Sequence, residues 1–186
     1  MEPVKKIEGR IQVLDRADVD TDQIIPKQFL KRIERSGFGE FLFHDWCNEG
    51  LELEPGRPIL VTGRNFGCGS SREHAVWALE DFGYKAVVAP SFADIFFANC
   101  TKIGVLPVTL PESEVRALME VDEAAIDLEQ QKVFFDGRDI PFEINAEIRE
   151  RLLAGLDDIA MTLEHTDEIE RFERERPETG SLTTTV

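Results

Sequence analysis

A glycine-rich segment between a short apolar strand and a packed helix constrains the fold of this chain more than any other feature. Residues 59–62 are a β-branched run bounded by turn residues, and the apolar density after Ser71 predicts a helix over 71–82. The stretch 63–69 holds three glycines in seven residues, so its backbone can adopt positive φ and let a ligand approach closely. A unit of this kind presents free backbone N–H groups at the helix start, where an anion is favoured.

Strands and helices continue to alternate beyond this unit. The expected elements are a strand over 59–62, a helix over 71–82 ended by Gly83, a strand over 86–89, a helix over 92–102 with Ser91 as cap and Gly104 beyond its end, and a strand over 105–110. This βαβαβ order predicts an α/β fold with parallel strands and right-handed crossovers. Ligand chemistry is then expected at the carboxyl ends of the strands.

The flanking segments complete one domain. The expected elements are an opening strand over 7–13, a loop through Asp22, a short helical segment after Pro26, an irregular segment over 36–56, a helix over 111–120, a hairpin over 126–144 that turns at Asp136-Gly137, and two C-terminal helices capped near Asn145 and Thr166. Four aromatic residues of the irregular segment are too apolar to remain open to water, and they form either a packed flap or a surface that faces a partner: Phe38, Phe41, Phe43 and Trp46. Without an internal repeat or a dividing linker, residues 1–176 are expected to form one domain and 177–186 a frayed tail.

Length and cysteine usage indicate one compact cytoplasmic domain. A chain of 186 residues can bury roughly 70% of its unfolded surface in a single core. No apolar N-terminal stretch resembles a signal peptide, and no run approaches the roughly 18 apolar residues of a membrane span. Cys47, Cys68 and Cys100 are odd in number and widely spaced, which suits a reducing compartment better than a disulfide framework. Their spacing also predicts no metal or iron–sulfur site in this chain.

The net charge of −16 excludes nucleic acid and anionic membranes as expected partners, since both require basic patches. The same charge repels a dianionic substrate, so a local basic island must hold any such substrate. The candidate residues are Lys27, Lys31, Arg32, Arg35, Arg64 and Arg72.

Two interpretations compete for the start of the first predicted helix. Ser70 and Glu73 have the S-x-x-E spacing of a capping box, so a purely structural Ser70 is the simpler interpretation. Such a cap does not need Ser71, however, and Arg72 beside a helix N-terminus opposes the helix dipole by roughly 0.3–1 kcal/mol. A bound carboxylate would remove that conflict. By residue type alone, His74 is expected to pack within the fold.

Four motifs, in order along the chain, resemble the swivelling domain of the aconitase superfamily. They are 19–30 (VDTDQIIPKQFL), 65–75 (NFGCGSSREHA), 89–96 (APSFADIF) and 155–160 (GLDDIA). Within that superfamily the chain is most similar to the bacterial small subunits of 3-isopropylmalate dehydratase. The glycine-rich segment matches neither a Walker A loop, nor G-x-G-x-x-G, nor a G-x-S-x-G elbow.

This resemblance implies a single α/β swivelling domain in a hydro-lyase. The implied reaction interconverts 2-isopropylmalate and 3-isopropylmalate by dehydration and rehydration, in leucine biosynthesis. An iron–sulfur cluster is expected on a large partner subunit, where its iron would act as Lewis acid on the departing hydroxyl. The chain alone is then inactive, and it acts on a small dicarboxylate only in a heterodimer with that large subunit.

The resemblance also implies roles for individual residues. Ser70 matches the first residue of the family's Ser-Ser-Arg triplet, the base that removes a carbon-bound proton, and Ser71 and Arg72 complete the triplet. Asp22 matches an aspartate that orients active-site groups, although residue type alone favours an Asx turn or a cap before Pro26.

Two further sets of residues are expected to contact the substrate. Lys31, Arg32 and Arg35 compete for a substrate carboxylate, because their spacing departs from the family pattern. Gly67 and Gly69 would allow backbone N–H groups to form a field like that of an oxyanion hole.

Three alternatives stay open from the sequence. A related dehydratase acting on citraconate, homoaconitate or a similar acid would carry the same motifs. A free-standing module could bind a phosphate or nucleotide at the glycine-rich helix start. A noncatalytic regulatory or scaffold subunit would tolerate loss of the Ser70 hydroxyl.

Overall fold

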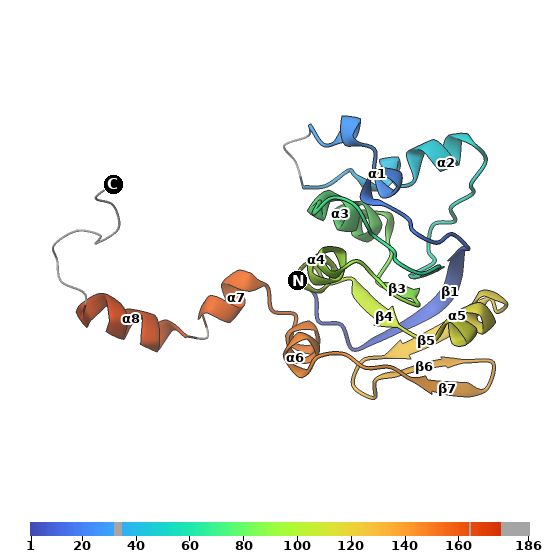
Figure 1. Cartoon of the computed structure of the whole chain (residues 1–186). Helices are drawn as coiled ribbons and strands as arrows, with labels where there is room; N and C mark the ends of the chain where they lie inside the picture. Colours follow the sequence, from blue (N-terminus) through green and yellow to red (C-terminus); the bar gives the residue numbers. More distant parts are fainter. Residues whose placement is uncertain (32–34, 164, 176–186) are drawn as a thin grey trace.

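The computed structural model describes residues 1–31, 35–163 and 165–175, and its strands form one mixed sheet (Figure 1). The strand order is β4-β3-β2-β1-β5-β6-β7. The strands are β1 (Lys6–Leu14), β2 (Ile59–Thr62), β3 (Ala86–Ala89), β4 (Leu106–Thr109), β5 (Glu123–Asp127), β6 (Lys132–Phe135) and β7 (Arg138–Pro141). Strands β1 to β4 pair in parallel, which confirms the predicted α/β class and its βαβαβ core.

Helices cover both faces of this sheet. They are α1 (Thr21–Ile24), α2 (His44–Asn48), α3 (Glu73–Phe82), α4 (Asp94–Ile103), α5 (Glu112–Met119), α6 (Ala146–Ala154), α7 (Asp158–Leu163) and α8 (Thr166–Glu175), with the 3-10 turns η1 (Lys27–Phe29) and η2 (Gly39–Phe41). Helices α3 and α4 lie on one face beneath α1, α2 and η2, whereas α5 and α6 pack on the other (Figure 1). The predicted glycines end α3 and α4: Gly83 and Gly104 have φ of 116° and 106°, which few other residues adopt.

Successive residues of the central strands pack into two separate cores. Leu60 and Val87 belong to the core beneath α3 and α4, whereas their neighbours Val61 and Val88 belong to the core on the α5 side. All four side chains are fully buried. Coverage of both faces explains why these strands appear in the sequence as continuous apolar runs rather than as alternating patterns.

The predicted aromatic flap packs against the domain. Phe38 and Phe43 are wholly buried in the core beneath α3, and Phe41 and Trp46 pack partly buried against the same core. The Arg16 guanidinium, at the end of β1, lies 4.1 Å from the centroid of the Trp46 ring. Of the two arrangements expected for this segment, the structure shows the packed one.

The capping box predicted at Ser70 is absent, which corrects the start of the first helix. Helix α3 begins at Glu73, its N-cap is Arg72, and no side chain caps it. The capping box of this region lies on α1, where the Asp20 side chain accepts from Gln23 N at 2.8 Å and the Gln23 side chain accepts from Asp20 N at 2.8 Å. The sequence analysis missed α1 because four residues are too few for a periodic signal. Ser70 is held by its backbone against α1, so the helix starts later than predicted.

Further element boundaries also differ from the predictions. Ser91 does not cap α4; its hydroxyl accepts a hydrogen bond from Asn65 N at 2.9 Å, and Ala93 is the N-cap. The predicted hairpin turns at Asp136-Gly137 as expected, but β5 adds a third antiparallel strand and joins the hairpin to β1. The acids and alanines of β5 have weak strand propensity, and pairing with β1 on one side and β6 on the other makes this segment a strand.

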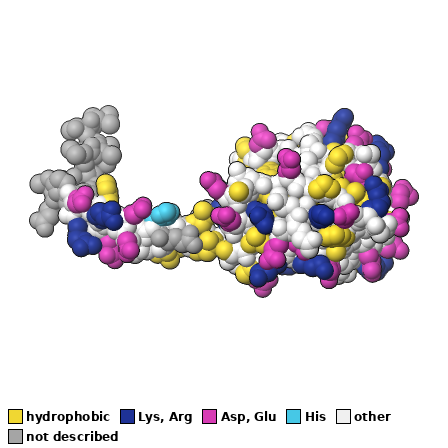
Figure 2. Space-filling model, turned by 90° about the horizontal axis from the view of Figure 1, so that it is seen from below, with side chains coloured by type: hydrophobic (Ala, Val, Ile, Leu, Met, Phe, Trp, Pro, Cys, Tyr) yellow, Lys and Arg dark blue, Asp and Glu magenta, His cyan; other side chains and the backbone are white. Residues whose placement is uncertain are grey.

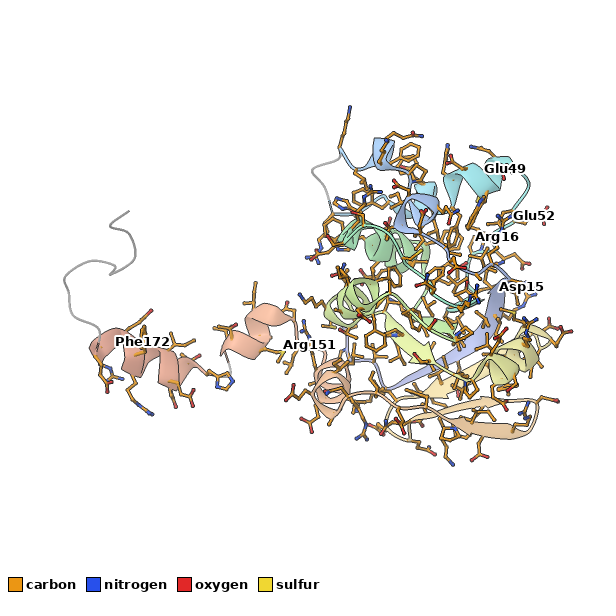
Figure 3. All side chains as sticks on the ribbon, in the orientation of Figure 1. Asp15, Arg16, Glu49, Glu52, Arg151 and Phe172 are labelled. Carbon is orange, nitrogen blue, oxygen red and sulfur yellow. The ribbon has the colours of Figure 1, made fainter. Side chains whose placement is uncertain are left out.

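Within the part of the C-terminal region that the structure describes, three helices follow the sheet where two were expected. Asn145 caps α6 as predicted, accepting from Glu147 N at 2.8 Å, and α8 begins at Thr166 as predicted. Helix α7 between them was not predicted. Helices α7 and α8 extend away from the body (Figure 1), and Phe172 projects from α8 with 67% of its surface exposed (Figure 3). The predicted tail 177–186 lies outside the described residues. Among the helices that the structure describes, none has the length and apolar character needed to cross a membrane.

Candidate active site

Three loops meet at the carboxyl ends of β1, β2 and β3. Parallel bridges join Asp20 to Cys68 and Phe66 to Phe92, so the pairing of the three strands continues into the loops. Gly67 N donates to Val19 O at 2.8 Å. The glycine-rich segment is therefore held on both sides by its neighbouring loops, at the sheet edge where the sequence predicted ligand chemistry.

Gly67 occupies a position that no other residue fits. Its φ is 78°, and an added Cβ would lie 2.0 Å from Cγ of Phe96. Phe96 is buried and belongs to the motif 89–96, so this close contact links two of the motifs quoted above. Gly69 has φ of 91°, but its added Cβ would come no closer than 3.5 Å, to Asp20 Cβ. Backbone conformation alone thus favours glycine at position 69, whereas both conformation and space require it at 67.

The predicted triplet lies where this loop meets α3. Ser70 and Ser71 are exposed, and neither side chain caps the helix. Arg72 is only 21% exposed and forms an ion pair through Nη1 with Oδ1 of Asp22, which lies on α1. The structure therefore brings four of the predicted site residues together: the three triplet residues and Asp22.

An Asp18 network, which the sequence analysis missed, fastens two of the loops. Asp18 accepts from Asn65 Nδ2 at 2.9 Å and from Arg64 Nη2 at 3.4 Å. These hydrogen bonds hold the pKa of the Asp18 carboxyl below its usual value, and the bond from Asn65 has the largest effect. Asp18 and Asn65 both have positive φ, at 56° and 55°. A signal was present, because Asp and Asn are the residues, apart from glycine, that most readily adopt this conformation.

His74 packs against the aromatic flap, as expected from residue type. Its ring lies 5.4 Å from the Phe38 ring, edge to face, and 4.5 Å from the Trp77 ring. Burial lowers the pKa of His74 below its ordinary value of 6.5. The neutral imidazole therefore serves as a packing group between α3 and the flap.

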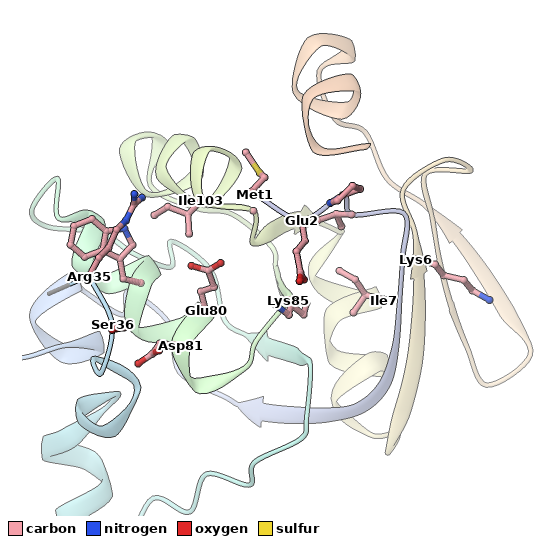
Figure 4. Close-up of a pocket in the computed structure, with 14 residues that line it drawn as sticks. Met1, Glu2, Lys6, Ile7, Arg35, Ser36, Glu80, Asp81, Lys85 and Ile103 are labelled. Atoms are coloured by element: carbon pink, nitrogen blue, oxygen red, sulfur yellow. The ribbon is translucent and has the colours of Figure 1, made fainter. Parts of the chain in front are cut away.

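Of the three basic candidates in the 31–35 segment, the two that the structure describes, Lys31 and Arg35, are not joined to the triplet. Lys31 is exposed, and Arg32 lies outside the described residues. The Arg35 guanidinium lies 5.0 Å from the centroid of the Trp77 ring and lines a cavity of about 790 Å³ together with Glu80. Figure 4 shows this cavity opening beside the N-terminal segment, and no residue of 65–74 lines it. Among the described residues, no hydrogen bond or ion pair connects Lys31 or Arg35 to the glycine-rich loop.

The described residues do not fit an iron–sulfur cluster or a metal ion. No group of three or more His, Cys, Asp or Glu side chains among them is arranged to hold a metal. Cys100 is wholly buried, and burial raises its thiol pKa. Cys68, in the glycine-rich loop, also has a raised pKa, from burial and from the charges of Asp20 and Asp18. Cysteines of this kind are protonated near neutral pH and are poor metal ligands.

On the face seen in Figure 2, charged side chains of both signs are interspersed. Figure 2 shows Asp and Glu side chains over much of the body, with Lys and Arg among them. Arg72 and Arg64 supply positive charge at the glycine-rich loop, and each is paired with one aspartate. Of the six basic residues proposed from the sequence, Arg64 and Arg72 thus lie at the glycine-rich loop, and their charges are balanced within the chain.

Comparison with known proteins connects this geometry to one family. The family model of the aconitase C-terminal domain matches residues 51–113, and a second model, for the C-terminal domain of the 3-isopropylmalate dehydratase small subunit, matches residues 158–179. The chain is 54% identical to the 3-isopropylmalate dehydratase small subunit of Rubrobacter xylanophilus, over 95% of this chain and 96% of that one. It is 48% identical to the 3-isopropylmalate dehydratase small subunit of Bacillus subtilis, over 95% and 97% of the two chains.

A solved structure agrees with the sequence relatives. The 3-isopropylmalate dehydratase structure from Methanocaldococcus jannaschii superimposes with a TM-score of 0.71 at 29% identity, covering 90% of this chain and 99% of that chain. Relatives this similar, matched over nearly their whole length, share the fold and the order of motifs that build the site. The chain therefore belongs to the family of 3-isopropylmalate dehydratase small subunits.

Proposed function

We propose that this chain supplies the proton-transfer side of a cytoplasmic 3-isopropylmalate dehydratase, a hydro-lyase of leucine biosynthesis. One observation carries the proposal. The Ser70-Ser71-Arg72 triplet is presented at the carboxyl edge of the sheet, with both serine side chains outside any helix cap and the arginine held by Asp22. A site of this kind, open on one side, supports completion by a second subunit. We assign the iron–sulfur cluster of the family to that large subunit.

Ser70 acts as the base in this proposal. Its Oγ takes the proton from the substrate carbon next to the one that bears the hydroxyl, and the electron pair of the broken C–H bond forms the C=C bond as the hydroxyl departs. Return of this proton to the carbon that first bore the hydroxyl, with addition of hydroxide to the neighbouring carbon, yields the isomer. The chain thus holds and returns one proton in each cycle.

A serine hydroxyl needs strong support to act as a base near neutral pH. A helix N-terminus supplies at most about 2 kcal/mol, or roughly one and a half pKa units. Backbone N–H groups must add to this field, and those of Gly69 and Ser71 donate to no other described residue. Arg72 adds a fixed positive charge two residues away. Donors oriented in advance toward a developing negative charge are the most effective form of such support.

Arg72 holds a substrate carboxylate. Asp22 engages one terminal nitrogen of the guanidinium, which leaves other N–H donors of the planar group to grip a carboxylate through two parallel bonds. Asp22 thereby orients the guanidinium.

The test reconstitutes the chain with the large subunit of its own organism and compares turnover of 2-isopropylmalate, 3-isopropylmalate, citraconate and homoaconitate. We expect the two isopropylmalates to give the highest kcat/KM by at least about tenfold. A higher kcat/KM for citraconate or homoaconitate would assign the chain to a related dehydratase instead. Binding of inorganic phosphate by the isolated chain, without any turnover in the complex, would favour an anion-binding module.

A further inference from the structure

We propose that Thr21 is a positioning residue for Ser70, acting through the Ser70 backbone without touching the substrate. The inference rests on the role of Ser70 proposed above. Thr21 is the first residue of α1 and is only 1% exposed. Its side chain is buried, so the hydroxyl is not open to substrate in this structure.

The Thr21 hydroxyl contacts the Ser70 backbone on both sides. Ser70 N donates to Thr21 Oγ1 at 3.2 Å, and Thr21 Oγ1 donates to Ser70 O at 3.3 Å. A hydroxyl carries one donor and two acceptor lone pairs, so one side chain can satisfy both bonds at once. Together they fix the two peptide groups that flank the Ser70 Cα. The direction of the Ser70 side chain depends on those two groups.

Helix α1 gives this contact a rigid base. Thr21 N donates to Cys68 O at 2.9 Å, and the capping box at Asp20 fixes the first turn. Ile24, at the other end of α1, is wholly buried. Thr21 therefore cannot follow Ser70 if the glycine-rich loop shifts, and Ser70 is held to a fixed frame.

Consecutive residues of α1 hold the two reactive groups of the site. Thr21 points inward and holds the Ser70 backbone, whereas Asp22 points outward and pairs with Arg72. The distance between the base and the carboxylate clamp is therefore set by two neighbouring residues of α1. This arrangement accounts for a threonine at position 21. A valine would fill the same volume but leave the Ser70 N–H, which has no other partner among the described residues, without an acceptor.

The experiment compares Thr21→Val, Thr21→Ser and a matched control in the reconstituted complex. Thr101→Val is the control. Thr101 lies on α4, away from the site, and is 5% exposed. Its hydroxyl also donates to a backbone carbonyl, that of Ala98, at 2.8 Å. We expect Thr21→Val to lower kcat by about 10- to 100-fold with KM within about threefold, since a misplaced reactive group costs this much. Thr21→Ser keeps the hydroxyl and should stay within about threefold of the parent in kcat, as should Thr101→Val. A Thr21→Val kcat within about threefold of the parent would overturn the inference.

A double-mutant cycle separates positioning from general stability. If Thr21 acts through Ser70, Thr21→Val should change the residual turnover of a Ser70→Ala complex by less than about twofold. An equal loss in both backgrounds would mean that Thr21 only stabilises the fold. If the Ser70→Ala complex turns over substrate at the parental rate, the proposed base is overturned and the Thr21 role with it. If Ser70→Ala is inactive but Thr21→Val turns over at the parental rate, only the Thr21 role is overturned.

A second pair of variants keeps the test decisive if Thr21→Val does not assemble with the large subunit. Thr21→Ser retains the oxygen, whereas Thr21→Cys replaces it with a sulfur that hydrogen-bonds weakly. We expect the serine variant to exceed the cysteine variant in kcat by about tenfold at similar melting temperature. Equal kcat in these two variants would contradict the positioning role.

Discussion

Ser70 is the residue whose removal separates catalysis from structure most cleanly. Its side chain is exposed and caps no helix. We therefore expect Ser70→Ala to change the free energy of unfolding by no more than about 0.5 kcal/mol, as for other surface substitutions. Turnover should fall by about 100-fold or more, because the base is lost. Melting, complex formation and turnover are the measurements.

Ser71→Ala is the matched comparison for that prediction. Ser71 is also exposed. The Thr21 hydroxyl, however, bonds to both peptide groups that flank Ser70 Cα, and not to both of those that flank Ser71 Cα. We expect Ser71→Ala to lose less turnover than Ser70→Ala at the same stability. The reverse order would move the base to Ser71.

Arg72 tests the carboxylate clamp at the same scale. Arg72→Lys keeps the charge but loses the planar fork, so kcat/KM should fall by roughly 10- to 100-fold. Stability should change little, because the Asp22 partner is half exposed and exposed ion pairs contribute little. Arg64→Lys is the control, since Arg64 belongs to the same loop and pairs with Asp18. Equal losses in the two variants would show that the effect is not specific to Arg72, and parental kcat/KM for Arg72→Lys would show that charge alone is sufficient there.

At the scale of elements, the glycine-rich loop and α4 depend on one close contact. Gly67→Ala places a Cβ against the Phe96 ring and also strains a positive φ. We expect a loss of about 2–5 kcal/mol in the free energy of unfolding, from overpacking and backbone strain together. Gly69→Ala carries only the backbone strain and should cost about 1–2 kcal/mol. Denaturant unfolding measures both, and similar losses would contradict the close packing on Phe96.

The contact between α3 and the flap should respond to pH through His74. Because burial lowers the pKa of His74 in the folded state, the folded protein binds this proton less readily than the unfolded chain. Neutral His74 therefore contributes fully to the free energy of unfolding above its ordinary pKa of 6.5. This contribution is lost as pH falls through the lower pKa of the folded state. His74→Gln removes this titration. We expect parent and variant to converge in unfolding free energy as pH falls from about 7 to about 5. An NMR titration that places the His74 pKa above 6.5 would contradict the prediction.

For the whole molecule, we predict that the isolated chain has no dehydratase activity and binds no stoichiometric iron. The described residues offer no metal-binding group of three or more ligands, and the proposed site needs the large subunit for its cluster. Iron content, colour and activity should appear only when the large subunit is added. An anaerobically purified single chain that holds iron and turns over substrate would contradict this prediction.

Much of the fold and the site could be predicted from sequence patterns that act over short distances. The strand at 59–62, the glycines that end α3 and α4, and the turn at Asp136-Gly137 follow from local conformational preferences of the residues concerned. The Ser-Ser-Arg triplet could be singled out because of its place between a buried strand and a helix. Family membership followed from the order of motifs along the chain, and the relatives confirm it.

Only the tertiary structure decided which groups hold that triplet. Helix α1 and the partnership of Asp22 with Arg72 depend on contacts between residues about fifty positions apart, which no local pattern encodes. The hydrogen bond from Ser70 N to the Thr21 hydroxyl is also a contact between distant residues. It holds Ser70 where a capping box was predicted, and α3 starts at Glu73. Local propensity is worth a fraction of a kcal/mol per residue, so a few long-range hydrogen bonds and buried contacts outweigh it. The sequence by itself thus determined the class of fold and pointed to the proposed reactive residues, whereas packing between distant loops determined how those residues are held.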